Sequence, residues 1–165
     1  AIEILTSDWG INLSKKRITV STSGIVPRMH LVADNKVRLA VSLNGVDNEI
    51  RSHLMPINKK YPLEVLLKAC REHYQRSKDK ITFEYVLIRG VTDSLDDAKK
   101  LHKLTRSVPC KINIIPFNEH SGSKFQSPTE EAVKAFQKEL MDLGSDTIGL
   151  VLGWQDIAHF EQIDF

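Results

Sequence analysis

Strand-like and helix-like segments alternate along almost the whole chain, and this alternation constrains the fold more than any other feature. Short runs rich in β-branched residues predict strands, and apolar residues spaced three and four apart predict helices. Strands separated by helices pair in parallel, so we predict an α/β fold with one parallel sheet. The expected strands are residues 17–23, 36–45, 80–93, 110–118 and 146–153.

The segments between these strands carry helix signals. For the helix after the third strand we expect Thr92 or Asp93 to act as the cap. For the last helix we expect Ser127 at the N-cap, Glu130 at the capping-box position and Gly144 at the C-terminal end. The expected helices are residues 25–35, 47–56, 61–77, 92–106 and 127–144.

The chain has 165 residues, of which 41% are hydrophobic, and this fits one globular domain. A complete eight-stranded α/β barrel needs about 250 residues, so a full barrel is excluded. No apolar run reaches the roughly 18 residues of a membrane span, and the start "AIEILTSDWG" lacks the features of a signal peptide. We expect a cytoplasmic protein. Residues 1–5 resemble the end of a helix, so we also expect the N-terminus to be a cut.

Two cysteines, Cys70 and Cys110, fall in separate predicted elements, and their spacing matches neither a metal knuckle nor a redox pair. We expect both to be buried thiols of a reduced protein. The formal net charge of +2 is too small to predict nucleic-acid binding by itself. The basic clusters at residues 15–17 and 59–60 are suited to phosphates, although such short runs are more often solvated.

Each of the first four predicted strands ends in small hydrogen-bonding residues. Parallel strands bring their carboxyl ends to one edge, where ligands of such sheets gather. We therefore expect a common site for a neutral, hydrogen-bonding ligand. The alternative is that these residues are ordinary caps and turn formers, which is weaker for Ser21 and Ser42 because both lie inside their strands. The residues are Ser21 to Gly24; Ser42 and Asn44; Arg89, Thr92 and Asp93; and Asn118 and Glu119.

Several long stretches resemble one family. They are "RITVSTSGIVP", "LAVSLNG", "RSHLMPINKKYPLEVLLKACR", "ITFEYVLIRGVTDS" and "PCKINIIPFN". They resemble the radical S-adenosylmethionine methyltransferases that methylate carbon 2 of an adenine in large-subunit ribosomal RNA and transfer RNA. The resemblance covers residues 1–144, which we interpret as the C-terminal part of the barrel, and residues 145–165 diverge as a tail.

The resemblance implies a six-stranded partial (β/α) barrel, here with its first strands missing. It implies a four-iron four-sulfur cluster held by a CxxxCxxC loop, and S-adenosylmethionine both as radical source and as methyl donor to a cysteine near the C-terminus. Ribosomal RNA and transfer RNA are the implied partners, and no membrane is involved. The family's S-adenosylmethionine contacts correspond to Ser21, to Ser42, Leu43 and Asn44, and to Asn118. Asn44 replaces the family's usual His.

The chain departs from the family where catalysis is concerned. It contains neither the CxxxCxxC motif nor the C-terminal carrier cysteine, and thiolates are what an iron–sulfur cluster requires. We therefore expect a fragment that is inactive alone. A non-catalytic RNA-binding or regulatory remnant that uses residues 15–17 and 59–60 is the alternative. An unrelated barrel enzyme acting on a phosphorylated metabolite would need a Gly-rich phosphate loop, which "NEHSGSKFQSP" does not provide.

Glu84 lies within the third predicted strand and leaves two interpretations open. Its carboxylate either binds the amino group of the ligand or forms an ion pair with an interior base such as Lys111. The oligomeric state is not predicted by any feature of the sequence.

Overall fold

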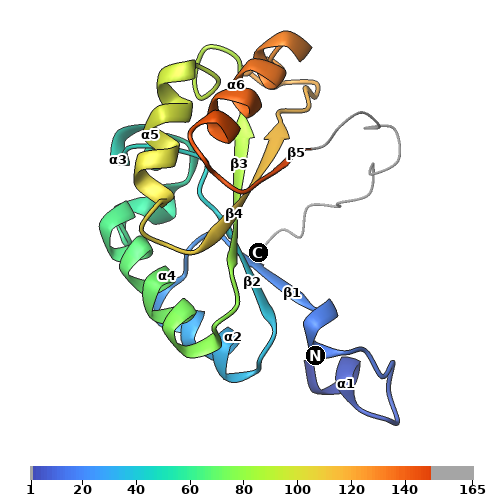
Figure 1. Ribbon diagram of the computed structural model, residues 1–165. Coiled ribbons are helices and arrows are strands. Elements are labelled where there is room, and N and C mark those ends of the chain that lie inside the picture. Colours follow the sequence, from blue (N-terminus) through green and yellow to red (C-terminus); the bar gives the residue numbers. More distant parts are fainter. Residues whose placement is uncertain (1, 150–165) are drawn as a thin grey trace.

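The computed structural model describes residues 2–149, and these contain one five-stranded parallel sheet (Figure 1). The strand order is β1-β2-β3-β4-β5, so β1 and β5 form the two edges. The predicted α/β fold with a single parallel sheet is confirmed. The strands are β1 (Thr19–Thr22), β2 (Arg38–Ser42), β3 (Ile81–Leu87), β4 (Cys110–Pro116) and β5 (Thr147–Gly149).

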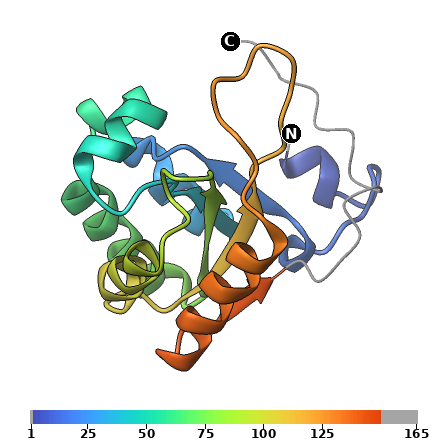
Figure 2. The same ribbon diagram turned by 90° about the horizontal axis from the view of Figure 1, so that it is seen from above.

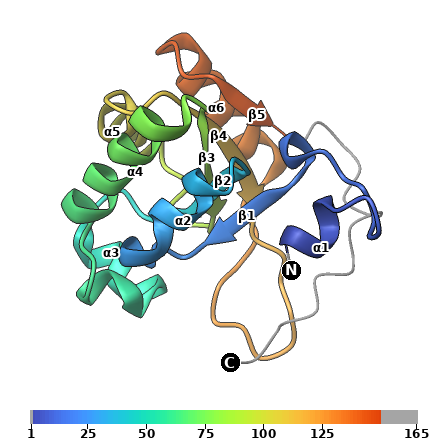
Figure 3. The same ribbon diagram turned by 90° about the horizontal axis from the view of Figure 1, so that it is seen from below.

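The helices that connect the strands cover one face of the sheet, whereas α1 lies apart from them, beside β1 (Figures 2 and 3). An open parallel sheet with its helices on one face is the arrangement expected of a partial barrel. The α-helices are α1 (Ile2–Thr6), α2 (Met29–Asp34), α3 (Asn48–Leu54), α4 (Leu63–Ser77), α5 (Leu95–Thr105) and α6 (Glu130–Asp142). Three 3₁₀ helices are η1 (Lys15–Arg17), η2 (Val26–Arg28) and η3 (Pro56–Lys59).

The predicted N-caps of two helices were wrong. Ser94, not Thr92 or Asp93, caps α5, and it forms a reciprocal capping box with Asp97. Thr129, not Ser127, caps α6 and accepts the Ala132 N–H at 3.2 Å. In each case the expected cap lies earlier in the chain and takes part in the preceding loop instead. The predicted end of α6 is confirmed, because Gly144 follows it with a left-handed φ of 86°.

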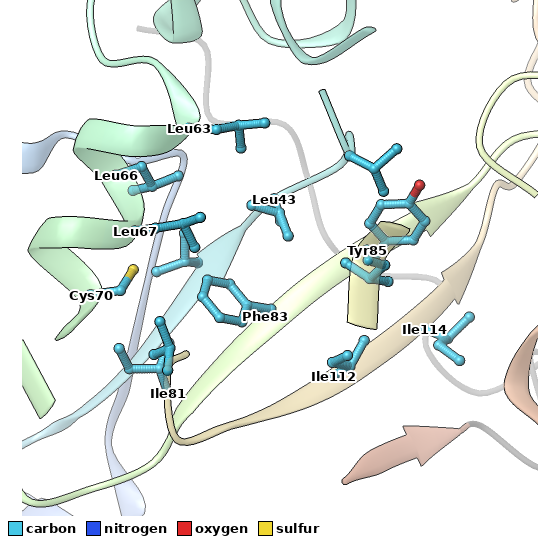
Figure 4. Close-up of a cluster of buried hydrophobic side chains, with 14 of the residues drawn as sticks. Leu43, Leu63, Leu66, Leu67, Cys70, Ile81, Phe83, Tyr85, Ile112 and Ile114 are labelled. Carbon is cyan, nitrogen blue, oxygen red and sulfur yellow. The ribbon is translucent and has the colours of Figure 1, made fainter. Parts of the chain in front are cut away.

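The core lies between the sheet and the helices, and it is built from alternate strand residues (Figure 4). Ile81, Phe83 and Tyr85 on β3 are fully buried, as are the neighbouring Ile112 and Ile114 on β4. Side chains alternate between the two faces of a strand, so the residues between these point to the opposite face. The core thus fixes which strand residues are left for a site.

The face opposite the helices is polar. Ser42, Glu84 and Asn113 lie side by side on it, because they are register partners on β2, β3 and β4. All three are half-buried. Ser21 on β1 is the register partner of Ala40, which lies two residues before Ser42 on the same face of β2. A row of hydrogen-bonding groups therefore crosses this face near the carboxyl ends of the strands.

The sheet continues beyond residue 144, because β5 pairs with β4. Trp154 and Phe160, which belong to the divergent tail, lie outside the described residues. Two interpretations stay predictions: that the first strands of the barrel are missing, and that the barrel part ends at residue 144. None of the helices among residues 2–149 is both long and apolar enough to cross a bilayer.

Tyr85 provides a test of the core. Its ring stacks on Phe136 with centroids 5.7 Å apart, and its buried hydroxyl has no hydrogen-bond partner among the described residues. Burial raises the pKa of this hydroxyl. We predict that Tyr85→Phe leaves the free energy of unfolding unchanged or raises it by up to about 1 kcal/mol, because an unpaired polar group is removed from the core.

Urea unfolding of the purified chain measures this change. Phe136→Leu is the matched comparison, and it is expected to lower stability by about 1 kcal/mol or more because it leaves a cavity beside the tyrosine ring. A loss above about 1 kcal/mol for Tyr85→Phe would mean that the hydroxyl is paired.

Candidate functional site

A buried arginine joins the carboxyl ends of β1 and β2. Arg51 on α3 is 0% exposed, and its guanidinium donates to four neutral oxygens. Nε donates to the Leu43 carbonyl at 2.9 Å, and Nη2 donates to the Ser23 and Ser42 carbonyls at 2.8 and 3.2 Å. Nη1 donates to Oδ1 of Asn58 at 2.9 Å. The backbone just after β1 is therefore held against the end of β2.

Two glycines leave the space that Arg51 needs. Gly24 follows β1 with a φ of 106°, and a Cβ there would lie 3.2 Å from Nη2 of Arg51 and 3.1 Å from Leu66. A Cβ on Gly45, after β2, would lie 2.8 Å from the backbone nitrogen of Arg51. Any larger residue would displace α3 or the guanidinium. The glycine that ends "STSG" thus leaves room for the guanidinium, and the glycine that ends "SLNG" leaves room for the backbone of α3.

Asn58 extends this network into the segment "MPINKKYP". Its side-chain amide is 1% exposed and donates to the backbone carbonyl and Oδ1 of Asn48 and to the Ser52 hydroxyl. Oδ1 of Asn48 also accepts the Leu63 N–H at the start of α4. The polar groups of this turn are thus paired without bulk water, which is what buried polar groups require.

The positive charge of Arg51 is stabilised by the dipoles of neighbouring carbonyl groups. Burial lowers the pKa of its guanidinium below the usual range, because the charged form loses its hydration. An arginine nevertheless stays protonated at neutral pH, and three backbone carbonyls and one amide oxygen face it. Hydrogen bonds to a charged donor are stronger than neutral ones. Loss of this side chain would leave several buried acceptors without donors.

Next to Arg51 and its hydrogen-bond partners, three side chains meet on the polar face of the sheet. The Ser21 hydroxyl donates to Oε2 of Glu84 at 2.9 Å, and the Ser42 hydroxyl donates to the same oxygen at 3.1 Å. The three residues come from β1, β2 and β3. Ser21 and Ser42, which the sequence singled out, are therefore brought together, and Glu84 is the group that joins them.

The predicted ion pair between Glu84 and Lys111 is wrong. Lys111 is exposed and is the register partner of Thr82, which lies two residues before Glu84 on β3. Among residues 2–149 no ion pair of Glu84 is present, and its hydrogen bonds come from the two serine hydroxyls. The carboxylate is thus paired with two hydroxyls rather than with a base, and its role as a ligand group stays a prediction.

Asn44 occupies a strained position that suits its residue type. Its φ is 51°, a left-handed conformation that asparagine tolerates better than most residues. Its Oδ1 accepts the Val86 N–H at 3.2 Å, and its Nδ2 lies 3.5 Å from the Met55 sulfur. The side chain therefore joins the end of β2 to β3. The role predicted for Asn44 in ligand binding stays a prediction.

The other two predicted contacts are placed differently. The Leu43 side chain is 0% exposed and lies in the core (Figure 4), and its N–H donates to the Glu84 carbonyl while its own carbonyl accepts from Arg51. Only a free lone pair of that carbonyl remains for a ligand. Asn118 lies two residues beyond β4, and it is exposed. It shares the carboxyl edge of the sheet, although it is not part of the hydrogen-bonded cluster on β1 to β3.

At the remaining strand ends, the alternative of caps and turns holds. The Thr22 hydroxyl accepts the N–H groups of Gly24 and Ile25. The Thr92 hydroxyl donates to the Val86 carbonyl and accepts the Ile88 N–H, so it closes the turn after β3. A carboxylate oxygen of Asp93 accepts the Gly90 N–H, and a carboxylate oxygen of Glu119 accepts the Ser127 N–H. The polar strand ends therefore comprise turn formers, the cluster of Ser21, Ser42 and Glu84, and two asparagines, Asn44 and Asn118, that lie outside both groups.

The cysteines do not fit an iron–sulfur cluster. Cys70 is fully buried on the helix side of the sheet, and burial raises its thiol pKa to about 12. Cys110 is half-buried rather than buried as predicted, because it opens β4 at the amino end of the sheet, and desolvation raises its pKa to about 11. Within residues 2–149, no group of three or more His, Cys, Asp or Glu side chains is arranged for a metal. The described residues therefore do not provide a ligand set for an iron–sulfur cluster.

The two basic clusters lie at opposite ends of the sheet. Residues 15–17 form η1, directly before the amino end of β1, and Lys16 forms an ion pair with Asp79 at 3.0 Å. Lys59 ends η3, which follows the carboxyl end of β2, and Lys60 lies over the Tyr61 ring. The clusters therefore do not form one continuous basic surface.

Comparison with known proteins decides the family. A family model described as the radical SAM superfamily matches residues 1–105. The chain belongs to the radical SAM superfamily. A solved radical SAM methyltransferase from Sphaerobacter thermophilus superposes on it with a TM-score of 0.86 at 39% identity, over 90% of this chain and 44% of the other. A domain of pyruvate-formate lyase-activating enzyme from Bacteroides vulgatus, at 21% identity and a TM-score of 0.64, shares the fold over 79% of each chain.

Relatives of this radical SAM chain share a common name. Proteins named dual-specificity RNA methyltransferase RlmN are similar to it, with 62% identity in Bdellovibrio bacteriovorus, 51% in Geobacter sulfurreducens and 46% in Syntrophotalea carbinolica. The matches cover 86–96% of this chain and 37–43% of the relatives. The chain therefore spans about two fifths of their length. That this share is the C-terminal part of the barrel stays a prediction.

Sequence reasoning missed Arg51 as the residue that organises the site of this radical SAM chain. A single arginine in a short amphipathic helix is usually solvated, so its charge gave no reason to place it inside. The available signal was the glycine after each of the first two strands, because a glycine at a strand end marks a close approach of another group. Gly24 approaches the Arg51 guanidinium, and Gly45 approaches the backbone and Cβ of the same residue.

Substitution of Arg51 tests this arrangement. We predict that Arg51→Met lowers the free energy of unfolding by at least about 2 kcal/mol, because several buried oxygens lose their donor. Arg76→Met is the control: Arg76 is 58% exposed and pairs with Asp34 at 3.1 Å, and such surface pairs contribute at most about 1 kcal/mol. Denaturant unfolding of both variants measures the difference. Equal losses of unfolding free energy for the two variants would contradict the organising role of Arg51.

Proposed function

We propose that this chain is part of a radical S-adenosylmethionine RNA methyltransferase and forms the edge that binds the nucleoside part of the cofactor. The observation that carries the proposal is the convergence of Ser21, Ser42 and Glu84 on one exposed sheet face, within a chain that is up to 62% identical to proteins named as RNA methyltransferases. Membership of the radical SAM superfamily supports S-adenosylmethionine as the cofactor. The cluster of Ser21, Ser42 and Glu84 supports the position of its binding site.

The cluster fits the chemistry of S-adenosylmethionine. The cofactor is positively charged at its sulfonium, and its ribose and amino-acid tail offer hydroxyl and ammonium donors. Two hydroxyl oxygens and a carboxylate provide acceptors for such donors. The carboxyl edge of a parallel sheet is also where cofactors of α/β proteins bind. Asn44 and Asn118 lie along the same edge and are candidates for further contacts.

The substrate class follows from the relatives. Their printed name is dual-specificity RNA methyltransferase, and the family that the sequence resembles methylates carbon 2 of adenine in large-subunit ribosomal RNA and in transfer RNA. We propose these two RNAs as the partners of the whole protein and the cytoplasm as its location. The two separate basic clusters give no support to a rival function as a self-sufficient RNA-binding remnant.

This chain alone is proposed to be inactive. The family uses a cluster ligated by three cysteines and a cysteine that carries the methyl group, whereas this chain has two cysteines, at positions 70 and 110. One of them is buried in the core, and the other lies at the opposite end of the sheet from the serines. The chain is therefore proposed to contribute binding groups and no redox chemistry.

Ligand binding tests the proposed site. We predict that the chain binds S-adenosylhomocysteine, and that Ser42→Ala weakens this binding about five- to tenfold through the loss of one hydrogen bond in the contact surface. Ser107→Ala is the control, because Ser107 is an exposed serine between α5 and β4, at the amino end of the sheet. Isothermal titration calorimetry measures both. Identical affinities for the two variants would refute the site.

Metal content tests the proposed inactivity. We predict that anaerobic reconstitution with iron and sulfide leaves less than a tenth of a cluster per chain, because the ligand set is incomplete. Iron and acid-labile sulfide assays, with ultraviolet–visible spectra, measure the content. A stoichiometric cluster that survives gel filtration would overturn the proposal.

A further inference from the structure

A cleft with a volume of about 270 Å³ lies at the amino end of the sheet. The end of α5, the first residues of β4 and the turn from α6 into β5 line it. Its apolar wall includes Val108 and Ile112, which are 2% and 1% exposed. The proposed cofactor site lies toward the carboxyl ends of the strands and does not include this cleft.

The carbonyl groups at the helix ends beside the cleft are already used within the fold. At the end of α5, the His102 carbonyl accepts the Arg106 N–H, and the Thr105 carbonyl accepts the Val108 N–H. At the end of α6, three successive carbonyls accept N–H groups of the following turn. These carbonyls are those of Glu139, Leu140 and Met141, and the N–H groups are those of Leu143, Ser145 and Gly144. The groups that favour a cation at a helix carboxyl end are therefore engaged.

The side chains at the rim of the cleft leave positive charge for a ligand. The Arg106 guanidinium is exposed and forms no ion pair or hydrogen bond with any of residues 2–149. Lys80 pairs with Asp146 at 3.0 Å, and these side chains are 54% and 46% exposed. Nδ1 of His102 lies 2.9 Å from the Ser145 hydroxyl oxygen. A guanidinium has donors and no acceptor, and its planar fork matches an oxyanion.

The charge of the whole amino end points to the same class of ligand. Parallel strands begin at one end of the sheet, and the residues that precede or open the strands include nine basic and two acidic ones. The complete chain is nearly balanced, with 23 basic and 21 acidic residues. The amino end therefore has a positive potential that attracts anions. Its charged residues are Lys15, Lys16, Arg17, Lys36, Arg38, Lys78, Asp79, Lys80, Arg106, Lys111 and Asp146.

We propose that this cleft binds a small organic anion, with the acidic group of the ligand at Arg106 and Lys80 and its apolar part on Val108 and Ile112. Asp146 competes with such a ligand for Lys80, and an exposed ion pair of this kind is weak enough to be replaced. The volume lies just below the usual range of about 300–1,000 Å³ for ligand cavities, so the ligand is small. This second site is independent of the proposed cofactor site.

Three probes separate the charged from the apolar contacts. Phenyl phosphate carries a ring and a charge, inorganic phosphate carries the charge alone, and phenol carries the ring alone. We expect the wild-type chain to bind phenyl phosphate about tenfold more tightly than either of the other two, because both kinds of contact contribute. Amide NMR spectra of the purified chain measure the affinity, and the shifts are expected at residues 102–112 and 144–146.

Two substitutions are expected to change this binding in opposite directions. Arg106→Gln should weaken phenyl phosphate about five- to tenfold, because charge-assisted hydrogen bonds are lost. Asp146→Asn should strengthen it about threefold, because Lys80 is released and a repelling carboxylate is removed. A gain of affinity cannot arise from unfolding of the variant. Arg76→Gln is the matched control, since Arg76 is 58% exposed on α4 and does not line the cleft.

Several results would overturn this inference. Equal losses for Arg106→Gln and Arg76→Gln, or inorganic phosphate that binds as tightly as phenyl phosphate, would mean a general attraction to positive charge and no site. Displacement of phenyl phosphate by S-adenosylhomocysteine would place it in the proposed cofactor site instead. The proposed function is tested separately, because it depends on the binding of S-adenosylhomocysteine and not of phenyl phosphate.

Discussion

The buried guanidinium of Arg51 holds the carboxyl ends of β1 and β2 together, and the geometry of the candidate site depends on it. β1 is an edge of the sheet and only four residues long, so its ladder alone gives it little rigidity. Arg51 adds bonds to the Ser23 and Ser42 carbonyls just where the polar residues begin. The serines on these two strands can therefore meet Glu84 in a fixed arrangement.

The polar residues at this edge of the sheet divide into those that hold the fold and those proposed for ligand binding. Gly24 and Asn58 are explained by contacts with the guanidinium and Gly45 by the close approach of the α3 backbone. Thr22, Thr92 and Asp93 are explained by turn geometry. The hydroxyls of Ser21 and Ser42 and the carboxylate of Glu84 bond to one another across β1, β2 and β3, and they are the groups that we propose for ligand binding. They stand half-exposed or exposed on the sheet face opposite α2 to α6, which no helix covers among residues 2–149.

Much of the fold was predictable because the signals were local. Alternating apolar residues in "ITFEYVL" place Phe83 and Tyr85 in the core and Glu84 on the other face, and the same rule separates Leu43 from Ser42. The proximity of Ser21 and Ser42 followed from parallel pairing alone. The N-caps were less predictable, because Thr92, Asp93 and Ser94 are all good caps, and tertiary bonds of Thr92 to β3 decided between them.

The remaining features depended on contacts between distant parts of the chain. The burial of Arg51 requires carbonyls from two strands, and no periodicity in "DNEIRSHL" encodes them. Glu84 accepts hydrogen bonds from Ser42 and Ser21, which lie 42 and 63 positions earlier in the sequence. Its pairing with the serines instead of Lys111 could therefore not be predicted from the sequence of its own strand. The proposed site in this chain is thus a place where long-range polar contacts override local patterns.

A crystal structure of the chain with S-adenosylhomocysteine tests the central claim most directly, namely that separate strands present their polar groups to one nucleoside. The account predicts the ligand across the carboxyl ends of β1, β2 and β3, within hydrogen-bond distance of the cluster of Ser21, Ser42 and Glu84. A ligand bound on the helix side of the sheet, or at its amino end beside Cys110, would contradict it.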